Sequence, residues 1–393
     1  MKQDKNFQIV NARAVTREDI LDRAIISIQD GKIADLSRDS RNLNKDLPVL
    51  DAGGAWVIPG FMDLHSDAIE KEIETRPGSC LPVEMAVAEL DKKLAAAGVT
   101  TIFHSISFAE KEYAILRTMD MAESIIRQIR AMQGQLSVKT RIHLRYEITN
   151  TESLPVITEL IRNRQVDLVS IMDHTPGQGQ FSTSEEFKKY YSAYFSRDEQ
   201  EVQEIMEQRK AIRDSVGLKN ACYVAEVCTE NKVPLASHDD DSREKIDFIA
   251  SLGAVISEFP INMEAMSLAR EQGLMVAVGS PNIIRGGSHN NNLRAMDIIR
   301  AKGADIVCSD YVPSTLLHAL FKIHSQCPMP LPEAVRLFST NPAKAVNADA
   351  STGRLEPGLD ADLLLVDSSL SYPRIIKTFV QGREAFSSCI PRD

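Results

Sequence analysis

Six acidic and imidazole side chains, each following an apolar segment, form the pattern in this sequence most able to do chemistry. Each stands at or just beyond the carboxyl end of a run that has the composition of a buried β-strand: His65, Asp67, Glu147, His174, His238 and Asp310. Imidazole and carboxylate together suit zinc or another borderline divalent ion, with no need for thiolate. Six ligands exceed what one catalytic zinc requires, and they suit two ions with a bridging carboxylate, for which Glu147 is the candidate. We therefore expect a binuclear site, with Zn²⁺ as the first choice and Mn, Fe or Mg as alternatives.

Each of these residues taken alone has an ordinary structural explanation. A single histidine at a strand end is more often a hydrogen-bonded structural group than a ligand, and Asp67 and Asp310 could cap the helices that follow them. The recurrence at the same end of separate strands favours the metal site. The remaining imidazoles are assigned differently: His143, four residues before Glu147, to the core, and His318 and His324 to an ordinary helix.

The stretch WVIPGFMDLHSD, residues 56–67, places Asp63, His65 and Asp67 at alternating positions. Residues two apart in a strand point to the same face, so one metal ion can bind both His65 and Asp67. Asp63 lies one step deeper along the same face. We expect it to support the site or the fold, not to bind metal.

A second group of polar residues follows the seventh predicted strand, in GSPNIIRGGSHNNN, residues 279–292. A glycine-rich turn beside an arginine is well suited to phosphate oxygens, and barrel enzymes often bind phosphate after strand seven. A plain glycine turn before a helix is the alternative. The residues predicted to bind an anionic substrate are Asn282, Arg285, Gly286, Gly287, Ser288 and His289, with Lys71 and Arg76 as further cations.

The elements that must position these groups alternate between strand and helix. Eight apolar strand candidates separated mostly by helical segments predict a (β/α)₈ barrel of the TIM type over residues 59–350. Short strands at both ends, 1–58 and 351–393, predict a small β-sandwich in which the two termini meet. Residues 181–220 exceed one crossover and predict two polar amphipathic helices, which form either a lid, an oligomer contact or a plain surface pair.

Composition narrows the class of protein. The chain has 393 residues, 43% of them hydrophobic, and a net charge of −10, which argues against a general nucleic-acid or membrane surface. None of the six scattered cysteines forms a C-x-x-C pair, and no segment has the length and apolar character of a membrane span or a signal peptide. We expect a cytoplasmic protein with a small anionic phosphorylated substrate and no nucleic-acid or membrane partner. A homo-oligomer remains open.

Two stretches of the sequence resemble the amidohydrolase superfamily, namely VIPGFMDLHSD and NPAKAVNADASTGRLEPGLDADLLLVD. Most members of that superfamily carry H-x-H after the first barrel strand, whereas Asp67 replaces the second histidine here. Together with Asp67, six further segments resemble the branch of diphosphatases in phosphonate catabolism: HSDAIEKEIETRPG, MDHTPGQGQF, ASHDDDS, EFPINMEA, SPNIIRGGSHNNN and SDYVPSTLL.

The resemblance, which covers about residues 8–385, implies a metal-dependent hydrolase of a phosphoanhydride bond. In that reading Asp310 orients the attacking water and takes its proton, while the 282–289 segment neutralises the substrate's charge. Two other functions are weighed against it. An amide-cleaving amidohydrolase would use the same metals in a different pocket, and a non-catalytic scaffold would lack ligands, yet all six positions are filled.

Overall fold

Eight parallel strands form the central sheet of the computed structural model, which describes residues 5–39, 41, 43–108, 115–179, 185, 187–188, 198–287, 293–369 and 371–388. Neighbouring strands pair in sequence order, and a parallel bridge from Ser66 to Asp310 joins the last strand to the first. The predicted (β/α)₈ barrel is confirmed. Its strands are β6 (Phe61–Ser66), β9 (Val99–Ser107), β10 (Lys139–Glu147), β11 (Leu168–Met172), β12 (Leu235–His238), β13 (Ile256–Glu258), β14 (Met275–Gly279) and β15 (Ile306–Cys308).

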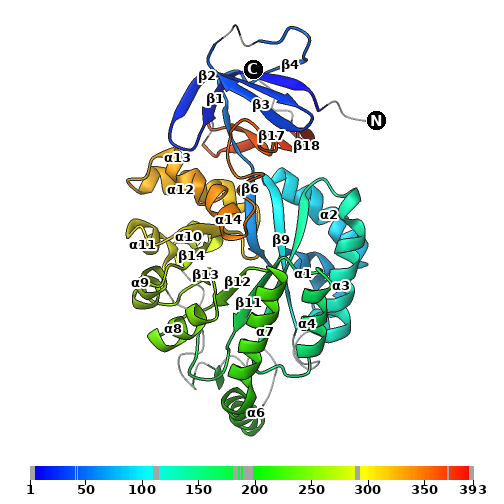
Figure 1. The fold of residues 1–393 in the computed structure, drawn as a ribbon, viewed down its shortest axis with the longest axis vertical. Coiled ribbons are helices and arrows are strands. Elements are labelled where there is room, and N and C mark those ends of the chain that lie inside the picture. The colour runs from blue at the N-terminus through cyan, green and yellow to red at the C-terminus, as the bar shows by residue number, and fades with distance from the viewer. Residues whose placement is uncertain are drawn as a thin grey trace.

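Helices surround this sheet (Figure 1), and their apolar faces pack on its outer side. In α4 (Leu154–Arg162) the buried residues Ile157, Leu160 and Ile161 follow the helical spacing of three and four. Side chains cap the amino ends of three helices, namely Asp198, Ser242 and Asn262. The other main helices are α1 (Ala68–Ile73), α2 (Val83–Ala96), α3 (Met119–Met132), α8 (Arg243–Ser251), α9 (Met263–Glu271), α10 (Ser280–Arg285), α11 (Ala295–Arg300), α12 (Thr315–Gln326), α13 (Leu331–Arg336) and α14 (Thr340–Ala345).

Strands from both ends of the chain form a second sheet, seen at the top of Figure 1. Its central pairing is β5 with β16, so a segment just before the barrel lies beside one just after it. The expectation that the termini meet in one β-rich unit is thus confirmed; the division at residues 58 and 350 stays a prediction. The strands are β1 (Phe7–Val15), β2 (Ile20–Gln29), β3 (Lys32–Ser37), β4 (Val49–Asp51), β5 (Trp56–Pro59), β16 (Leu363–Asp367), β17 (Arg374–Val380) and β18 (Arg383–Ser387).

Gly60 separates β5 from β6, where the chain passes from one sheet to the other. A Cβ atom at this position would overlap with the side chain of Thr100. We expect Gly60→Ala to lower the free energy of unfolding by roughly 1–3 kcal/mol, because a packed junction must open to accept the methyl group. Urea unfolding measures the change. Gly134→Ala is the matched control, since nothing lies within 4 Å of its added Cβ; equal effects of the two substitutions would contradict the explanation.

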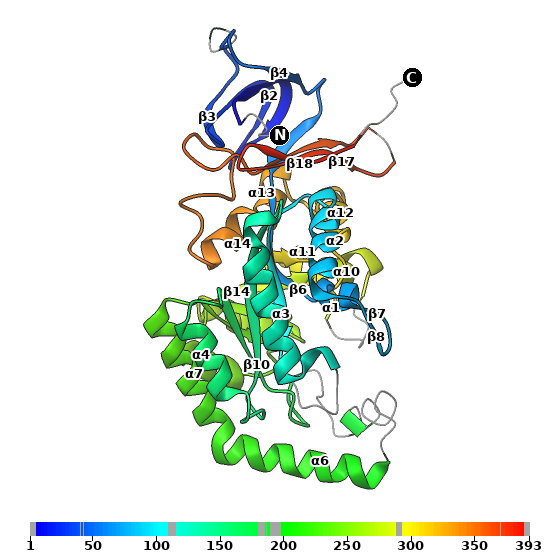
Figure 2. The same ribbon diagram turned by 90° about the vertical axis from the view of Figure 1, so that its right-hand side faces the viewer.

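The predicted helical insertion lies only partly within the described residues, so the expectation of two helices over 181–220 stays a prediction. Within the described residues, α6 (Glu199–Ile212) continues through a π-helical segment, Arg213–Gly217, into α7 (Leu218–Asn231). The second of these helices packs against α4 and leads into β12, so it is the regular crossover helix. Helix α6 extends past the barrel at the end away from the β domain (Figure 2). Most of residues 181–197 lie outside the described part of the chain.

No helix in the described residues is both long enough and apolar enough to cross a membrane.

His104 on β9 is buried in an apolar layer, and neither of its ring nitrogens has a hydrogen-bond partner. Its neighbours two residues away, Ile102 and Ile106, belong to the core between the barrel and the helices. Burial lowers the pKa of His104 to about 4, because the protonated ring cannot be solvated there.

This histidine predicts a pH-dependent stability. Between about pH 6.5 and 4 the unfolded chain binds a proton at His104 that the folded chain does not bind. The free energy of unfolding therefore decreases as the pH falls through this window. The loss of stability due to His104 reaches about 3 kcal/mol near pH 4. We expect His104→Leu to become more stable than the wild type as the pH falls from 7 to 4.5, in urea titrations at each pH. His324→Leu, at an exposed position, is the control; a constant difference between His104→Leu and wild type across this range would refute the assignment.

Candidate active site

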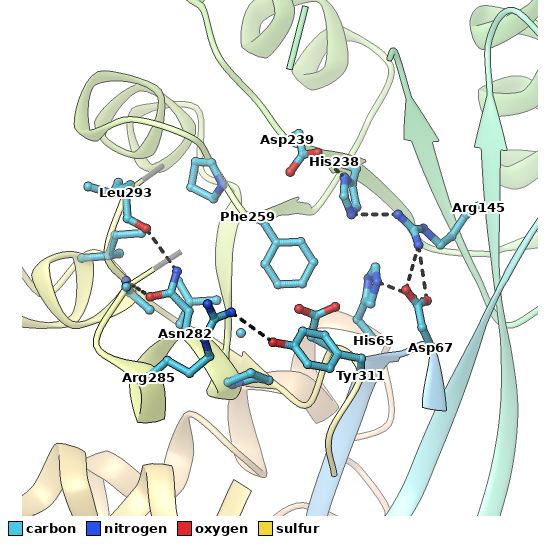
Figure 3. Close-up of a pocket in the computed structure, with 18 residues that line it drawn as sticks. His65, Asp67, Arg145, His238, Asp239, Phe259, Asn282, Arg285, Leu293 and Tyr311 are labelled. Atoms are coloured by element: carbon cyan, nitrogen blue, oxygen red, sulfur yellow. Dashed lines mark hydrogen bonds and ion pairs between the residues drawn. The ribbon is translucent and has the colours of Figure 1, made fainter. Parts of the chain in front are cut away.

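The carboxyl ends of β6, β12, β13 and β15 converge on one pocket, which Figure 3 shows with its lining residues. Backbone hydrogen bonds hold the first and last strands together there: the Asp310 amide donates to the His65 carbonyl (2.9 Å), and the Asp67 amide donates to the Asp310 carbonyl (2.6 Å). Three residues that follow these strands, Asp239, Phe259 and Asp310, have φ between 53° and 56°. Such left-handed conformations in non-glycine residues are uncommon and cluster at functional sites.

His65, Asp67 and Asp310 form the first group whose ligand atoms all lie within 4.8 Å of one another. The Nε2 atom of His65 is 3.8 Å from Oδ1 of Asp67. Asp67 occupies the N-cap position of α1, but its side chain accepts no capping hydrogen bond. The alternative interpretation of Asp67 as a helix cap therefore does not account for its carboxylate, which lines the pocket instead.

Glu258, at the end of β13, is a residue of the site that the sequence analysis missed. Its Oε1 atom lies 3.1 Å from Nδ1 of His65, and Ser170 donates a hydrogen bond of 2.6 Å to its Oε2. Burial lowers the pKa of His65, but the buried Glu258 carboxylate outweighs it, so that pKa is raised overall. A carboxylate on one ring nitrogen leaves the other nitrogen for a metal ion. Glu258 is an acid at the carboxyl end of a strand, which is the same signal that identified the predicted ligands on the other strands.

The second group consists of His174, His238 and Asp239. Asp239 lies between the two histidines, with its Oδ2 atom 3.2 Å from Nδ1 of His238 and 3.6 Å from Nε2 of His174. Although burial favours the neutral acid, His238 and His174 hold the pKa of Asp239 well below its usual value. Asp239 was absent from the predicted ligands, although it directly follows His238.

Glu147 is not in either of these groups. Its Oε2 atom lies 2.8 Å from Nδ1 of His174, which offsets burial and lowers the pKa of this carboxyl. The structure therefore places Glu147 against one predicted ligand, and it is Asp239 that lies between two of them.

Arg145, two residues before Glu147 on β10, is a further residue that the sequence analysis missed. Its Nη1 atom lies 3.3 Å from both carboxylate oxygens of Asp67, and its Nη2 atom lies 3.1 Å from Nε2 of His238. Figure 3 shows it on the side of the pocket formed by these two residues. Burial disfavours ionised Asp67, yet Arg145 and His65 keep the pKa of this acid below its usual value.

Two polar residues deeper in the barrel hold the strands together. The Ser309 amide donates to Oδ1 of Asp63 (2.9 Å), and burial raises the pKa of Asp63 to about 6. His143 is fully buried, with Nδ1 2.9 Å from the carbonyl of Leu64. Within the described residues, neither belongs to the two groups above or to the third group of candidate ligands, which is His65, His238 and Glu258. His318 and His324 lie on α12, as expected.

The predicted anion-binding residues are divided between the pocket and structural roles. Arg285 lines the pocket, with Nη1 3.5 Å from the hydroxyl of Tyr311. Asn282 also lines it, but its amide donates to the Leu293 carbonyl and accepts from the Ala295 amide. Lys71 Nζ lies 4.2 Å from the ring centroid of Tyr311.

The glycine-rich segment is partly helical. Residues 280–285 form α10, and Gly286 ends it in the left-handed conformation that glycine readily adopts. Gly287 lines the pocket. Arg76 is exposed on the β7–β8 hairpin, Glu74–Arg76 with Ser79–Cys80, and is not among the lining residues. Ser288 and His289 lie outside the described residues.

Comparison with known proteins bears on the identity of this site. The model of the amidohydrolase family matches residues 56–385. The α-D-ribose 1-methylphosphonate 5-triphosphate diphosphatase of Escherichia coli (strain K12) is 31% identical over 385 residues, which cover 96% of this chain and all of that one. An L-hydantoinase of Paenarthrobacter aurescens is 34% identical over 99 residues, 25% of this chain and 18% of the relative.

Solved structures share the fold. The N-acetylglucosamine-6-phosphate deacetylase of Pasteurella multocida superimposes with a TM-score of 0.65 at 13% identity, covering 96% of this chain and 99% of that one. A molinate hydrolase superimposes with a TM-score of 0.64 at 14% identity, covering 98% and 95%. With the family model matched over most of the chain and a relative similar along its whole length, this protein belongs to the amidohydrolase family.

Proposed function

We propose that this hydrolase cleaves a phosphoanhydride bond of α-D-ribose 1-methylphosphonate 5-triphosphate, releasing the 5-phosphate and pyrophosphate. The observation that carries the proposal is the similarity to the E. coli diphosphatase, which extends over that enzyme's full length. Two arginines in the pocket, Arg145 and Arg285, support it, because a polyphosphate needs cationic partners.

The side chains at the rim fit divalent metal ions. His65 has the Glu258 carboxylate on its Nδ1 side and Asp67 near its Nε2 atom, and Asp310 belongs to the same candidate group. Such a set of nitrogen and oxygen donors suits Zn²⁺, with Mn, Fe or Mg as alternatives. His174, His238 and Asp239 would hold the second ion of a binuclear site, with Glu147 against His174. Ions bound there would lower the pKa of a coordinated water, supplying hydroxide near neutral pH.

The chain's own residues perform the remaining steps in this proposal. The Asp310 carboxylate orients the attacking water and accepts its proton. Oxygen of the water bonds to the α-phosphorus, the bond from this phosphorus to the bridging oxygen breaks, and pyrophosphate leaves with its electron pair. Arg285 neutralises charge on the triphosphate, assisted by the Gly286 and Gly287 amides and by Lys71. Arg76, Asn282, Ser288 and His289 stay predicted substrate-binding residues.

The experiment is a direct assay of the purified, metal-loaded protein. Phosphorus NMR should show the ribose triphosphate converted to the 5-phosphate and pyrophosphate in equal amounts. The local similarity to an L-hydantoinase makes cyclic amide hydrolysis the second candidate, so hydantoins are assayed in parallel. Ring opening without pyrophosphate release would reject the proposed substrate in favour of amide hydrolysis. Absence of both reactions and of bound metal would favour a non-catalytic scaffold.

A further inference from the structure

Arg145 carries a buried charge in the pocket, and the proposed chemical steps do not say which part of the substrate it contacts. Its side chain is 9% exposed and reaches the pocket from β10, on the same strand face as Glu147. Guanidinium stays protonated in proteins, so this charge persists at every physiological pH. A buried charge is costly without close, hydrogen-bonded partners.

The partners that Arg145 has are distant for a charged pair. Its two contacts with Asp67 are both 3.3 Å, whereas charge-assisted N–H···O bonds are usually about 2.7–2.9 Å. Its Nε atom is buried and has no hydrogen-bond partner. The guanidinium group therefore has unused capacity to bind an anion.

Both partners of Arg145 also belong to the proposed metal-binding set. If the Nε2 atom of His238 binds a cation, its single lone pair is no longer free to accept a hydrogen bond from Arg145, and a cation on Asp67 competes with Arg145 for the charge of that carboxylate. The guanidinium then lies beside a positive centre and needs another anionic partner. Substrate phosphoryl oxygens are the anions that would be in reach, since Arg145 lines the same pocket.

Arg285 provides the second point of attachment. It lies on the far side of the pocket from Arg145, with His65, Phe259 and Tyr311 between them (Figure 3). Among the described residues that line this pocket, these two are the only arginines, and no lysine lines it. A single phosphate would be bound by one arginine, whereas a chain of phosphoryl groups can contact both.

We propose that Arg145 is a substrate-binding residue that contacts the phosphoryl group nearest the metal-binding side chains, while Arg285 binds the other end of the polyphosphate. This inference rests on the proposed function, because it assumes that Asp67 and His238 bind metal. It adds a specificity: the pocket selects linear polyphosphates over a single phosphate.

Isothermal titration of the holoenzyme with inorganic tripolyphosphate tests the proposal. Excess Mg²⁺ is kept in both solutions so that the probe does not strip the protein's metal, and metal content is measured before and after. Arg145→Met should weaken tripolyphosphate binding by about 10- to 100-fold, the usual loss for a charge-assisted hydrogen bond. Binding of orthophosphate should change much less.

Arg141→Met is the matched control. Arg141 lies on the same face of β10 at the opposite end of the strand, and it lines a different cavity. This variant should bind tripolyphosphate like the wild type. Unchanged binding by Arg145→Met would overturn the proposal. Loss of metal from Arg145→Met would also overturn it, because the arginine would then hold the metal ligands in position and not the substrate.

Chemical rescue of tripolyphosphate binding by added guanidinium tests for a direct contact, separately from any change in packing that the substitution causes. Guanidinium chloride at non-denaturing concentration should restore tripolyphosphate binding to Arg145→Ala and have no such effect on Arg141→Ala; failure to restore it would count against a direct contact. Because titration does not require turnover, it decides the role of Arg145 even if the ribose triphosphate is not hydrolysed.

Discussion

Asparagine in place of Asp310 is expected to lower kcat for pyrophosphate release by about 10²- to 10⁴-fold, the usual contribution of a positioned general base. The amide cannot accept the proton of the attacking water, and it is a weaker metal ligand than carboxylate. The backbone should be preserved, because main-chain hydrogen bonds to the end of β6 hold residue 310 in place. Steady-state kinetics with the ribose triphosphate measure the loss.

Asp305→Asn is the control for this substitution. Asp305 directly precedes β15, the strand that Asp310 follows, so it lies at the opposite end of that strand. There it accepts hydrogen bonds from Arg270 and the Val276 amide. This variant should keep the wild-type kcat. More than a tenth of the wild-type kcat in Asp310→Asn, at wild-type metal content, would exclude Asp310 as the base.

Removal of metal is expected to abolish hydrolysis, with a fall in rate of at least about 10³-fold, because no other group on the rim would generate hydroxide at neutral pH. Dialysis against a chelator followed by addition of Zn²⁺, Mn²⁺, Fe²⁺ or Mg²⁺ identifies the ions that restore activity. The ions should also raise the melting temperature, since a ligand bound only to the folded state stabilises it by about 2.7 kcal/mol at 100 times its Kd.

Metal analysis of two histidine variants locates the ions. His238→Ala should bind less metal than the wild type, because His238 belongs to two candidate groups, one with His174 and Asp239 and one with His65 and Glu258. His324→Ala, exposed on α12, should bind the wild-type amount. Full activity after chelation, with no metal detected, would remove the metal-dependent mechanism.

Local patterns account for the architecture. Eight apolar strands separated by amphipathic helices, with caps such as Ser242 and Asn262, leave a (β/α)₈ barrel as the arrangement that buries every apolar face. Because carboxyl ends of parallel strands meet at one rim, the same pattern predicts that His65, His238 and Asp310 lie close together. This part follows from periodicities of two and three to four residues, which neighbouring residues determine.

Contacts between strands that are distant in the sequence decided which residues at the rim touch one another. Glu147 and Asp239 both follow strands, yet only Asp239 lies between two histidines. Glu258 and Arg145 joined the site because strand tilt and side-chain length bring them to His65, Asp67 and His238. Such distances depend on the rotation of each strand and on rotamers chosen in a packed interior.

The sequence by itself therefore determined which side chains stand at the rim of a barrel, since that depends on position along each strand. Only the tertiary structure decided which of them touch. The alternation at Asp63, His65 and Asp67 illustrates both: the spacing put all three on one face, but packing against Ser309 left Asp63 in the core, whereas the other two reach the pocket.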